Sequence, residues 1–325
     1  MRAVLLLLAL LALLVAIPGN QAGMLAARAD PSAKRIALSF DDAPRGPGAF
    51  FSEDERAERL IEALKAAGAE QAVFFVNPGR ISRGDGDETR LARYVTAGHV
   101  IADHSFSHFK LSRTSAADYL TDIDKAEGWL KGRAGYRPWF RFPALDEGGG
   151  DTVKRDAVRI GLAARGLRNA YVTVDGLDWN MEALTVAAKR AGKPIDREAL
   201  RNLYVETMVQ SADFSDALAR RAIGHSPAHM LLLHETDLAA LYIGDLIDAL
   251  KADGWQIVTA DEAYADPVYS QAPDTRFAGG GTLIEQIAWE KGLSGSRWYA
   301  RNDIRTADAL FDARVLHEGG AGAAR

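Results

Sequence analysis

The chain of 325 residues contains no cysteine and carries no excess of positive charge. Without cysteine it has neither a disulfide framework nor thiol chemistry, and soft metals lose the thiolates that they prefer. A bound metal would therefore use nitrogen and oxygen ligands. The formal net charge of -5 provides no basic field for a phosphate backbone. Since no stretch interleaves a Lys/Arg cluster with aromatic residues, we expect no nucleic-acid partner.

The N-terminus lacks an apolar run of the length that a membrane-spanning helix needs. Arg2 precedes an apolar stretch from Ala3 to Ile17, whereas a span takes about 20 apolar residues. This pattern is typical of a secretory signal peptide, and Ala27-Arg28-Ala29 fits the cleavage pattern. We expect residues 1–29 to be a signal peptide and the mature protein to be exported, periplasmic or extracellular, without a stable membrane span. An uncleaved N-terminal anchor is the alternative.

The rest of the chain has the composition and patterning of one α/β catalytic domain with attachments. Hydrophobic side chains make up 48% of the residues, enough for one large core. Apolar runs of strand length alternate with segments of helical length, which is typical of a mainly parallel sheet. Strands are predicted at 36–40, 72–76, 99–102, 139–142, 170–174, 229–233 and 256–258. Helices are predicted at 53–66, 88–97, 115–131, 151–164, 182–190, 197–223, 238–251 and 283–291. About seven alternations predict a barrel, with an open sheet as the alternative.

Polar residues follow the predicted strands at their carboxyl ends. In α/β barrels these ends and the loops beyond them build the active site. The residues are Asp41 and Asp42 after the first strand, His104 after the third, Arg141 at the fourth, Asp175 and Asp178 after the fifth, and His234 after the sixth.

Two constellations among these residues offer ligands for one divalent metal. Asp41 and Asp42 end a strand together, and His104 and His108 are four residues apart. Such a set supplies three ligands and one spare carboxylate to act as a base, which is typical of a hydrolase. The alternatives are a solvated acidic turn and two unrelated histidines. The pair is not the zinc-protease motif HExxH, because Ser105 follows His104.

Five short runs in the chain resemble a known family. LSFDDAP, GHVIADHSFSH, FRFPALDEG, VDGLDW and LLLHE have the order and rough spacing of the motifs of the polysaccharide deacetylase family, the NodB homology domain of carbohydrate esterase family 4. The resemblance covers about residues 36–265. It implies an irregular (β/α) barrel of about seven strands, with a catalytic domain over 30–265 and a C-terminal extension of unknown role over 266–325.

The resemblance also implies how a metal and a base are arranged. Asp42, His104 and His108 would bind the metal, leaving positions open for water and for the substrate carbonyl. Asp41 would be the general base that takes a proton from the attacking water, and Arg141 would hold Asp41 in place.

A second set of residues would serve the leaving group and the acetyl group. By the same resemblance, His234 would be the general acid that protonates the departing amine, oriented by Asp178. Trp179 and Leu232 would line the pocket for the acetyl methyl, and a backbone N–H near Ala144 would stabilise the oxyanion.

Three positions depart from the family pattern. Ala43 and Leu145 stand where glycine is usual, and Glu235 stands where aspartate is common. We expect altered loop shapes and a changed neighbour of His234, with all reacting groups kept. Because Leu145 would crowd the site, substrate preference is the property that these changes affect most.

We therefore expect a metal-dependent hydrolase that removes acetyl groups from N-acetylated amino sugars of a peptidoglycan or chitin-like glycan. Its nitrogen and oxygen ligands suit Zn²⁺ best, with Co²⁺, Ni²⁺ or Mn²⁺ as substitutes. Alternatives are an O-acetyl esterase with the same chemistry and a non-catalytic glycan-binding protein on the same fold. A phosphoesterase would be expected to carry more cations at the strand ends than Arg45 and Arg141.

Overall fold

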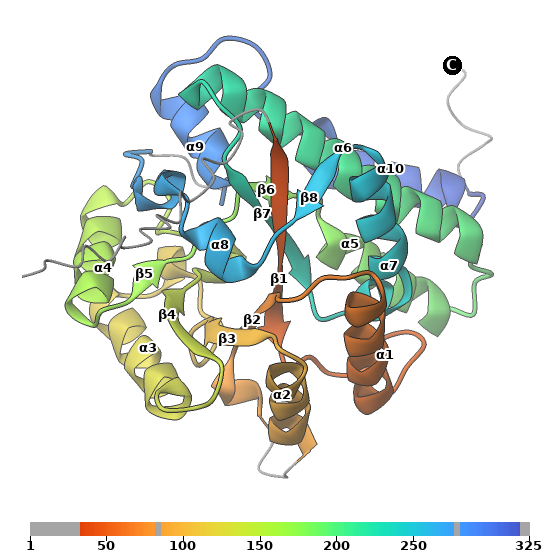
Figure 1. Ribbon diagram of the computed structural model, residues 1–325, viewed down its shortest axis with the longest axis horizontal. Coiled ribbons are helices and arrows are strands. Elements are labelled where there is room, and N and C mark those ends of the chain that lie inside the picture. Colours follow the sequence, from red (N-terminus) through yellow and green to blue (C-terminus); the bar gives the residue numbers. More distant parts are fainter. Residues whose placement is uncertain (1–32, 82–85, 276–279, 319–325) are drawn as a thin grey trace, which may run out of the picture. The chain divides into compact units, whose positions relative to one another are not determined.

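The computed structural model describes residues 33–81, 86–275 and 280–318 of the chain (Figure 1). All described residues belong to one compact unit within Pro31–Arg325. The predicted signal peptide therefore lies outside the described residues. None of the described helices combines the length and the apolar character that crossing a membrane requires.

The described residues form one parallel sheet of eight strands, seven of which follow the order β5-β4-β3-β2-β1-β7-β6 while β8 pairs with β1. The sheet curls into an irregular (β/α) barrel, which confirms the predicted fold class. Because the strands run parallel, their carboxyl ends meet at one end of the barrel. The strands are β1 (Lys34–Ala43), β2 (Val73–Val76), β3 (Val100–Asp103), β4 (Tyr136–Phe140), β5 (Arg168–Asn169), β6 (Val174–Asp175), β7 (Ala228–His234) and β8 (Trp255–Ile257).

The prediction of a single strand over 170–174 is wrong. The chain forms the short strands β5 and β6 instead, at opposite ends of the strand order, and the buried residues 170–173 connect them. The Ala170 N–H donates to the Phe140 carbonyl (2.7 Å) and the Thr173 N–H to the Met230 carbonyl (3.1 Å). A strand was predicted because the segment is rich in aromatic and β-branched residues. It does not form one, because it has to connect the two ends of the sheet.

The helices agree with the prediction more closely than the strands do. Helices α1 (Glu53–Ala66) and α6 (Arg197–Ile223) have the predicted bounds, and six others begin and end within four residues of them. The Ser115 hydroxyl accepts the Asp118 N–H, as expected for a helix start there. The other helices are α2 (Gly86–Thr96), α3 (Ala116–Leu130), α4 (Thr152–Ala164), α5 (Asp178–Arg190), α7 (Asp237–Ala252), α8 (Ala260–Tyr264), α9 (Leu283–Glu290) and α10 (Ile304–Arg314). Of these, α8 and α10 were not predicted.

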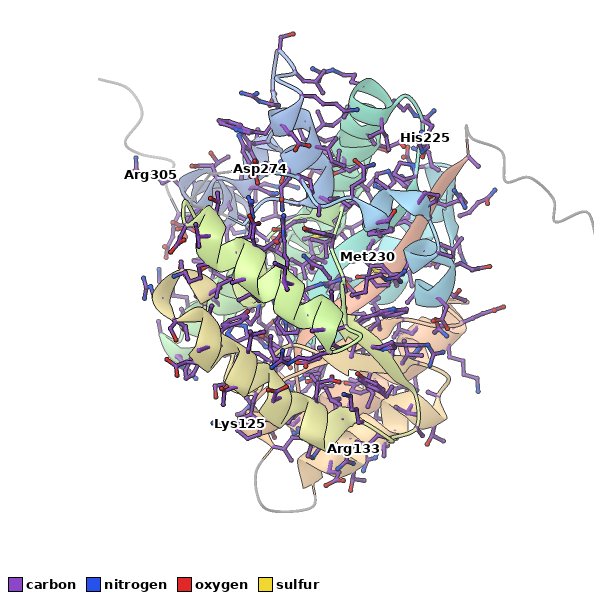
Figure 2. The ribbon with its side chains drawn as sticks, turned by 90° about the vertical axis from the view of Figure 1, so that its left-hand side faces the viewer. Lys125, Arg133, His225, Met230, Asp274 and Arg305 are labelled. Carbon is purple, nitrogen blue, oxygen red and sulfur yellow. The ribbon has the colours of Figure 1, made fainter. Side chains whose placement is uncertain are left out.

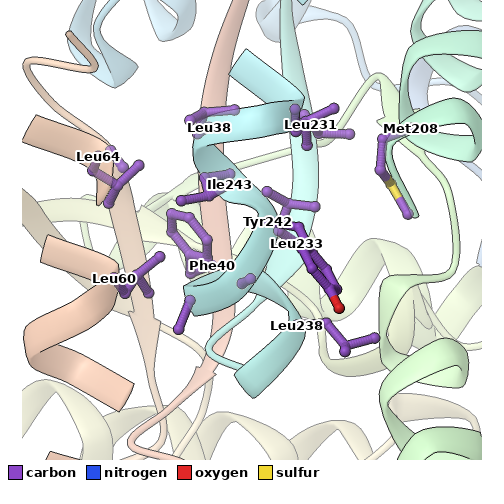
Figure 3. Packing of buried hydrophobic residues seen from close by; sticks show 14 of the residues in the cluster. Leu38, Phe40, Leu60, Leu64, Met208, Leu231, Leu233, Leu238, Tyr242 and Ile243 are labelled. Atoms are coloured by element: carbon purple, nitrogen blue, oxygen red, sulfur yellow. The ribbon is translucent and has the colours of Figure 1, made fainter. Parts of the chain in front are cut away.

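Helices cover the outer face of the sheet, and side chains from both layers form the largest apolar cluster (Figure 3). Figure 2 shows α3 and α4 side by side along one flank. On β1, Leu38 and Phe40 belong to the outer cluster, together with Leu231 and Leu233 of β7. Successive side chains of a strand point to opposite faces. The alternate residues of both strands, which include Asp41 and His234, therefore face the barrel interior.

The C-terminal extension packs against the same unit. Helix α9 lies on α6, and α10 contacts α5 and α6. The Leu283 N–H donates to the Val172 carbonyl (2.7 Å), which supports the segment that connects β5 and β6. Gly280 approaches the loop after β4 so closely that a Cβ atom there would overlap the Ala144 carbonyl oxygen. The extension thus contacts one of the predicted site loops.

Candidate active site

The three predicted metal ligands converge at the carboxyl ends of β1 and β3. One donor atom from each of Asp42, His104 and His108 lies within 4.8 Å of the others. The Oδ1 atom of Asp42 is 2.8 Å from His108 Nε2 and 3.5 Å from His104 Nε2. The structure therefore brings these side chains together, and their donor set contains only nitrogen and oxygen, as the absence of cysteine requires.

The donor atoms fit a cation. The buried Asp42 Oδ1 atom accepts no hydrogen bond of normal geometry from the described residues, although two imidazole nitrogens face it. Burial by itself would raise the pKa of Asp42, but His104 and His108 outweigh it and hold the pKa well below its usual range. Asp42 is thus a charged carboxylate with an oxygen facing two nitrogens, which is an arrangement that Zn²⁺ accepts.

The loop that carries the two histidines is fixed by hydrogen bonds to its backbone. Asn77 Nδ2 donates to the carbonyl oxygens of His104 and Ser105. The Asp103 carboxylate accepts the Ser105 N–H (2.6 Å), and the Ser105 hydroxyl accepts the His108 N–H (3.0 Å). Two of the ligands, Asp42 (φ 68°) and His108 (φ 58°), have left-handed backbone. Such conformations cost free energy and tend to gather at functional sites.

Arg141 connects the predicted base to the predicted ligands. Its Nη1 donates to Asp41 Oδ1 at 2.7 Å, while its own carbonyl lies 2.9 Å from His104 Nδ1. Since a carbonyl oxygen only accepts, Nδ1 carries the proton and His104 Nε2 is left as the free donor atom. The Asp41 Oδ2 atom lies 3.6 Å from that Nε2. One buried arginine thus contacts both the predicted base and a predicted ligand.

The predicted acid lies beside the predicted base. Asp41 of β1 is the register partner of His234 of β7. Asp178, at the start of α5, accepts both the His234 backbone N–H (2.7 Å) and a bond from His234 Nδ1 (2.7 Å). Burial would lower the pKa of His234, but the charge and hydrogen bond of Asp178, with Asp42 and Asp41, raise it to about 9. The imidazole is therefore protonated at neutral pH.

The residues predicted to contact the substrate differ in how exposed they are. Leu232 is buried and belongs to the same face of β7 as His234, two residues away. Trp179, next to Asp178, is 39% exposed. Ala144 and Leu145 follow β4, and both have left-handed backbone, with φ of 55° and 51°. Leu145 thus has a backbone conformation that glycine would adopt without strain. This agrees with the sequence comparison, in which glycine is usual at this position of the family pattern.

Several residues of the site were missed by sequence reasoning. Arg141 also donates to Ser39 Oγ (2.8 Å) and to the Tyr264 hydroxyl (2.6 Å). Ser39 could have been found, since it lies two residues before Asp41 on the same strand face. Glu235 turns away from His234 and accepts the Arg45 N–H (2.8 Å) and the Tyr94 hydroxyl (2.9 Å). These contacts join residues far apart in the chain, which no local pattern reports.

Comparison with known proteins supports the resemblance seen in the sequence. Residues 28–164 match the family model described as polysaccharide deacetylase. Over this region, somewhat less than half of the chain, the sequence is similar to the polysaccharide deacetylase family. The matched region contains Asp41, Asp42, His104, His108 and Arg141, whereas Asp178 and His234 lie beyond it. The match to the family model therefore covers the candidate metal ligands and does not reach the predicted acid.

Two relatives align with more of this chain. It is 25% identical over 236 residues to the peptidoglycan-N-acetylglucosamine deacetylase PgdA of Listeria monocytogenes, covering 72% of this chain and 39% of that protein. It is 24% identical over 238 residues to the chitin deacetylase of Colletotrichum lindemuthianum, covering 71% of this chain and 79% of that protein. The chain thus spans about two fifths of the length of the Listeria protein.

A solved structure supports the fold. The chitin deacetylase from Colletotrichum lindemuthianum superposes with a TM-score of 0.50 at 20% identity, covering 76% of this chain and 92% of that chain. At this identity the likeness concerns the fold, the NodB-like barrel already described.

Proposed function

We propose that this protein is a metal-dependent hydrolase that removes acetyl groups from N-acetylated amino sugars of a glycan. The observation that carries the proposal is the register of β1 and β7, which places Asp41 beside His234. Asp41 also lies 3.6 Å from His104 Nε2, at the edge of the cluster of candidate ligands. The residues that we propose as base, acid and cation ligands thus lie at one end of the barrel.

Asp42, His104 and His108 would hold the cation, most naturally Zn²⁺. A bound divalent cation supplies two effects, which are polarisation of the acetyl carbonyl and acidification of water at neutral pH. The protein's own part is to keep one ligand, His104, in the required tautomer through the Arg141 carbonyl. It also buries Asp42, so that bulk water does not compete for its charge.

Asp41 would take the proton of the attacking water. Arg141 occupies Asp41 Oδ1 and leaves Oδ2, the atom nearer to the ligand cluster, free to accept. The water oxygen then bonds to the acetyl carbon, and the developing oxyanion would be stabilised by the backbone N–H at Ala144. Because the base is held by a charge-assisted bond, it needs little reorganisation when the proton arrives.

His234 would protonate the nitrogen as the carbon–nitrogen bond breaks, giving acetate and a free amine. An amide nitrogen is a poor leaving group without that proton. Asp178 keeps the imidazole charged and aims Nε2 away from itself, since it binds Nδ1. An ester needs less help from an acid, so a charged histidine here favours the amide substrate over the O-acetyl ester.

The substrate would be a glycan such as peptidoglycan or a chitin-like polymer. Exposed Trp179 offers an apolar face near the acid, and buried Leu232 bounds the space for the acetyl methyl. The matched relatives act on peptidoglycan N-acetylglucosamine and on chitin, as their names state. We also propose export of the protein, for which the N-terminal sequence is the support.

The test is acetate release from N-acetylated and O-acetylated glycans by the purified protein, with added zinc or cobalt and with chelator. We expect release from the N-acetylated substrates, loss with chelator and recovery with zinc. Asp41→Asn and His234→Asn should each abolish most of the release. If acetate were released from O-acetylated glycans alone, the protein would be an esterase and not an amidase. Binding of glycans without release by the zinc-loaded protein would replace it by a non-catalytic role.

A further inference from the structure

A cavity of about 390 Å³ opens beside the candidate metal ligands, between the loop after β1 and helix α5. Its lining includes four arginines, Arg45, Arg56, Arg80 and Arg190, and one acidic residue, Glu182. The Nη1 atoms of Arg45 and Arg80 lie 2.7 Å and 3.3 Å from Asp42 Oδ2. The cavity therefore shares two of its arginines with the metal site.

Most of the hydrogen-bonding capacity of three of these arginines is unused. A guanidinium has five N–H donors in a planar fork. Arg45 and Arg80 each use only Nη1 in side-chain bonds to described residues, in both cases toward Asp42. Arg190, exposed on α5, makes no ion pair or hydrogen bond with a side chain in the described part of the chain. The remaining donors are available to a molecule in the cavity.

The fourth arginine has a structural part. Arg56 is 1% exposed and donates to the carbonyl oxygens of Arg45 (2.7 Å) and Gly46 (2.8 Å). Its charge is balanced by Glu235 and Asp237, each 3.5 Å away. The Glu235 carboxylate also accepts the Arg45 N–H at 2.8 Å. A buried ionic network thus fixes the loop that carries Arg45. Because the loop is already ordered, a ligand that binds there loses little free energy in ordering it.

The charges that face the cavity do not cancel. Burial and the nearby Asp237 raise the pKa of Glu182 to about 7, so at neutral pH this carboxyl is only partly ionised. Asp42 balances part of the charge of Arg45 and Arg80, but in the proposed function its own charge serves a cation. Three guanidinium groups are left around a space that is larger than a single carboxylate.

We propose that this cavity binds a carboxylate-bearing sugar of the glycan, next to the sugar that loses its acetyl group. The planar guanidinium fork matches the two oxygens of a carboxylate. Since Arg45 and Arg80 also touch Asp42, the acidic sugar lies beside the reacting one. The substrate class is therefore an acidic glycan with N-acetyl groups. This inference rests on the proposed function and narrows its substrate.

The test compares a neutral oligomer of N-acetylglucosamine with the same oligomer after partial oxidation of its primary alcohols to carboxylates. Binding is measured by calorimetry in an Asp41→Asn background, which prevents turnover, at low and high salt. Acetate release is measured separately with the protein that carries Asp41. We expect about tenfold tighter binding of the oxidised oligomer, and a preference that shrinks as salt screens the charges.

Two variants identify the source of that preference. Arg190→Gln and Arg45→Gln should each remove most of it, and the affinity of Arg190→Gln for the neutral oligomer should stay within about twofold. Arg190 is an exposed helix residue, so its replacement leaves the fold intact even if Arg45→Gln disturbs Asp42. Arg305→Gln, on the exposed surface of α10 (Figure 2), is the matched control and should keep the preference.

Equal binding of the two oligomers, or a preference that survives both variants, overturns the inference. Acetate release with equal binding leaves the proposed function standing and removes only the acidic subsite. Tighter binding of the oxidised oligomer without any acetate release keeps the subsite and removes the proposed reaction.

Discussion

Two histidines at the carboxyl ends of β3 and β7 have the same side chain and different neighbours. His104 Nδ1 lies 2.9 Å from the carbonyl oxygen of Arg141. His234 Nδ1 lies 2.7 Å from the carboxylate of Asp178. In both cases one ring nitrogen is bound to an acceptor of the protein, and the other is left for chemistry.

The difference lies in the charge of the acceptor. A neutral carbonyl fixes the tautomer without favouring the imidazolium, so Nε2 of His104 keeps a lone pair for a cation. A carboxylate favours the imidazolium, and the pKa of His234 is raised to about 9 although burial opposes this. The acceptor bound to Nδ1 thus determines whether Nε2 of the histidine can donate an electron pair to a metal or a proton to a leaving group. Five predictions on four variants test this comparison.

The largest effect is expected for His104→Gln, which removes the electron-pair donor. The zinc content of the purified protein should fall from about one per chain to near zero. Acetate release should fall to the level of the chelated protein, about a thousandfold or more, since a catalytic metal contributes several kcal/mol. His225→Gln, at the exposed histidine labelled in Figure 2, is the control and should change neither property. A zinc-replete and active His104→Gln protein would remove His104 from the ligands.

The replacement His234→Asn should separate proton donation to the leaving group from metal binding. We expect acetate release to fall on the order of a hundredfold or more, while zinc content stays at the level of the unaltered protein. Metal analysis and steady-state kinetics on one preparation measure both. Loss of zinc together with activity would show that His234 belongs to the metal site and not to the leaving group.

Asp178→Asn should lower the pKa of His234 and leave the ring in place. In the metal-free protein, an NMR titration should give a pKa of about 9 for the unaltered chain. In the variant it should fall toward the ordinary value of about 6.5, because burial is then opposed only by the charges of Asp42 and Asp41. At neutral pH acetate release should fall about 10-fold to 100-fold, and the alkaline fall in kcat/KM should move to lower pH.

The same variant carries a stability signature. The folded pKa of His234 lies above its unfolded value, so the stabilisation by this ion pair is fully present below about pH 6.5. It is lost as the pH rises through about 9. The difference in free energy of unfolding between the metal-free unaltered chain and Asp178→Asn should therefore narrow from pH 6 to pH 10. A difference that is constant over this range would contradict the assignment.

The smallest effect is expected for Asn77→Ala, which leaves both histidines and both acceptors in place. It removes two hydrogen bonds to the backbone of the ligand loop. Zinc affinity should fall about tenfold, as measured by competition with a chelator, while the pKa of His234 stays unchanged. Asn202→Ala, at an exposed position of α6, is the control. An unchanged zinc affinity would show that the loop holds its shape without Asn77.

The convergence of the candidate residues could be predicted because each of them belongs to a short local pattern. Asp41 and Asp42 end an apolar run, and His104 and His108 follow one with fixed spacing. A parallel sheet then brings such strand ends together whatever the chain does between them. The roles assigned to these residues remain predictions that the experiments above address.

The orienting contacts were harder to predict because they depend on the tertiary structure. Nothing near Arg141 in the sequence indicates that its carbonyl faces His104, and nothing near Glu235 indicates the Arg45 N–H. The segment 170–173 has the composition of a strand, but the closure of the sheet determines its conformation. Helix α10, whose buried residue is Phe311, has too few apolar side chains for a clear helical pattern.

The pairing of β1 with β7 has a consequence for the history of such a chain. Adjacent strands lie about 4.8 Å apart wherever a ladder forms, and the ladder pairs Asp41 with His234. The separation of the two side chains is therefore set by peptide geometry and not by the long stretch of chain that connects them. Insertions and deletions in that stretch can reshape the surface around this end of the barrel while the separation of Asp41 and His234 stays constant. If the proposed reaction is correct, its substrate preference could change in this way without a change in its chemistry.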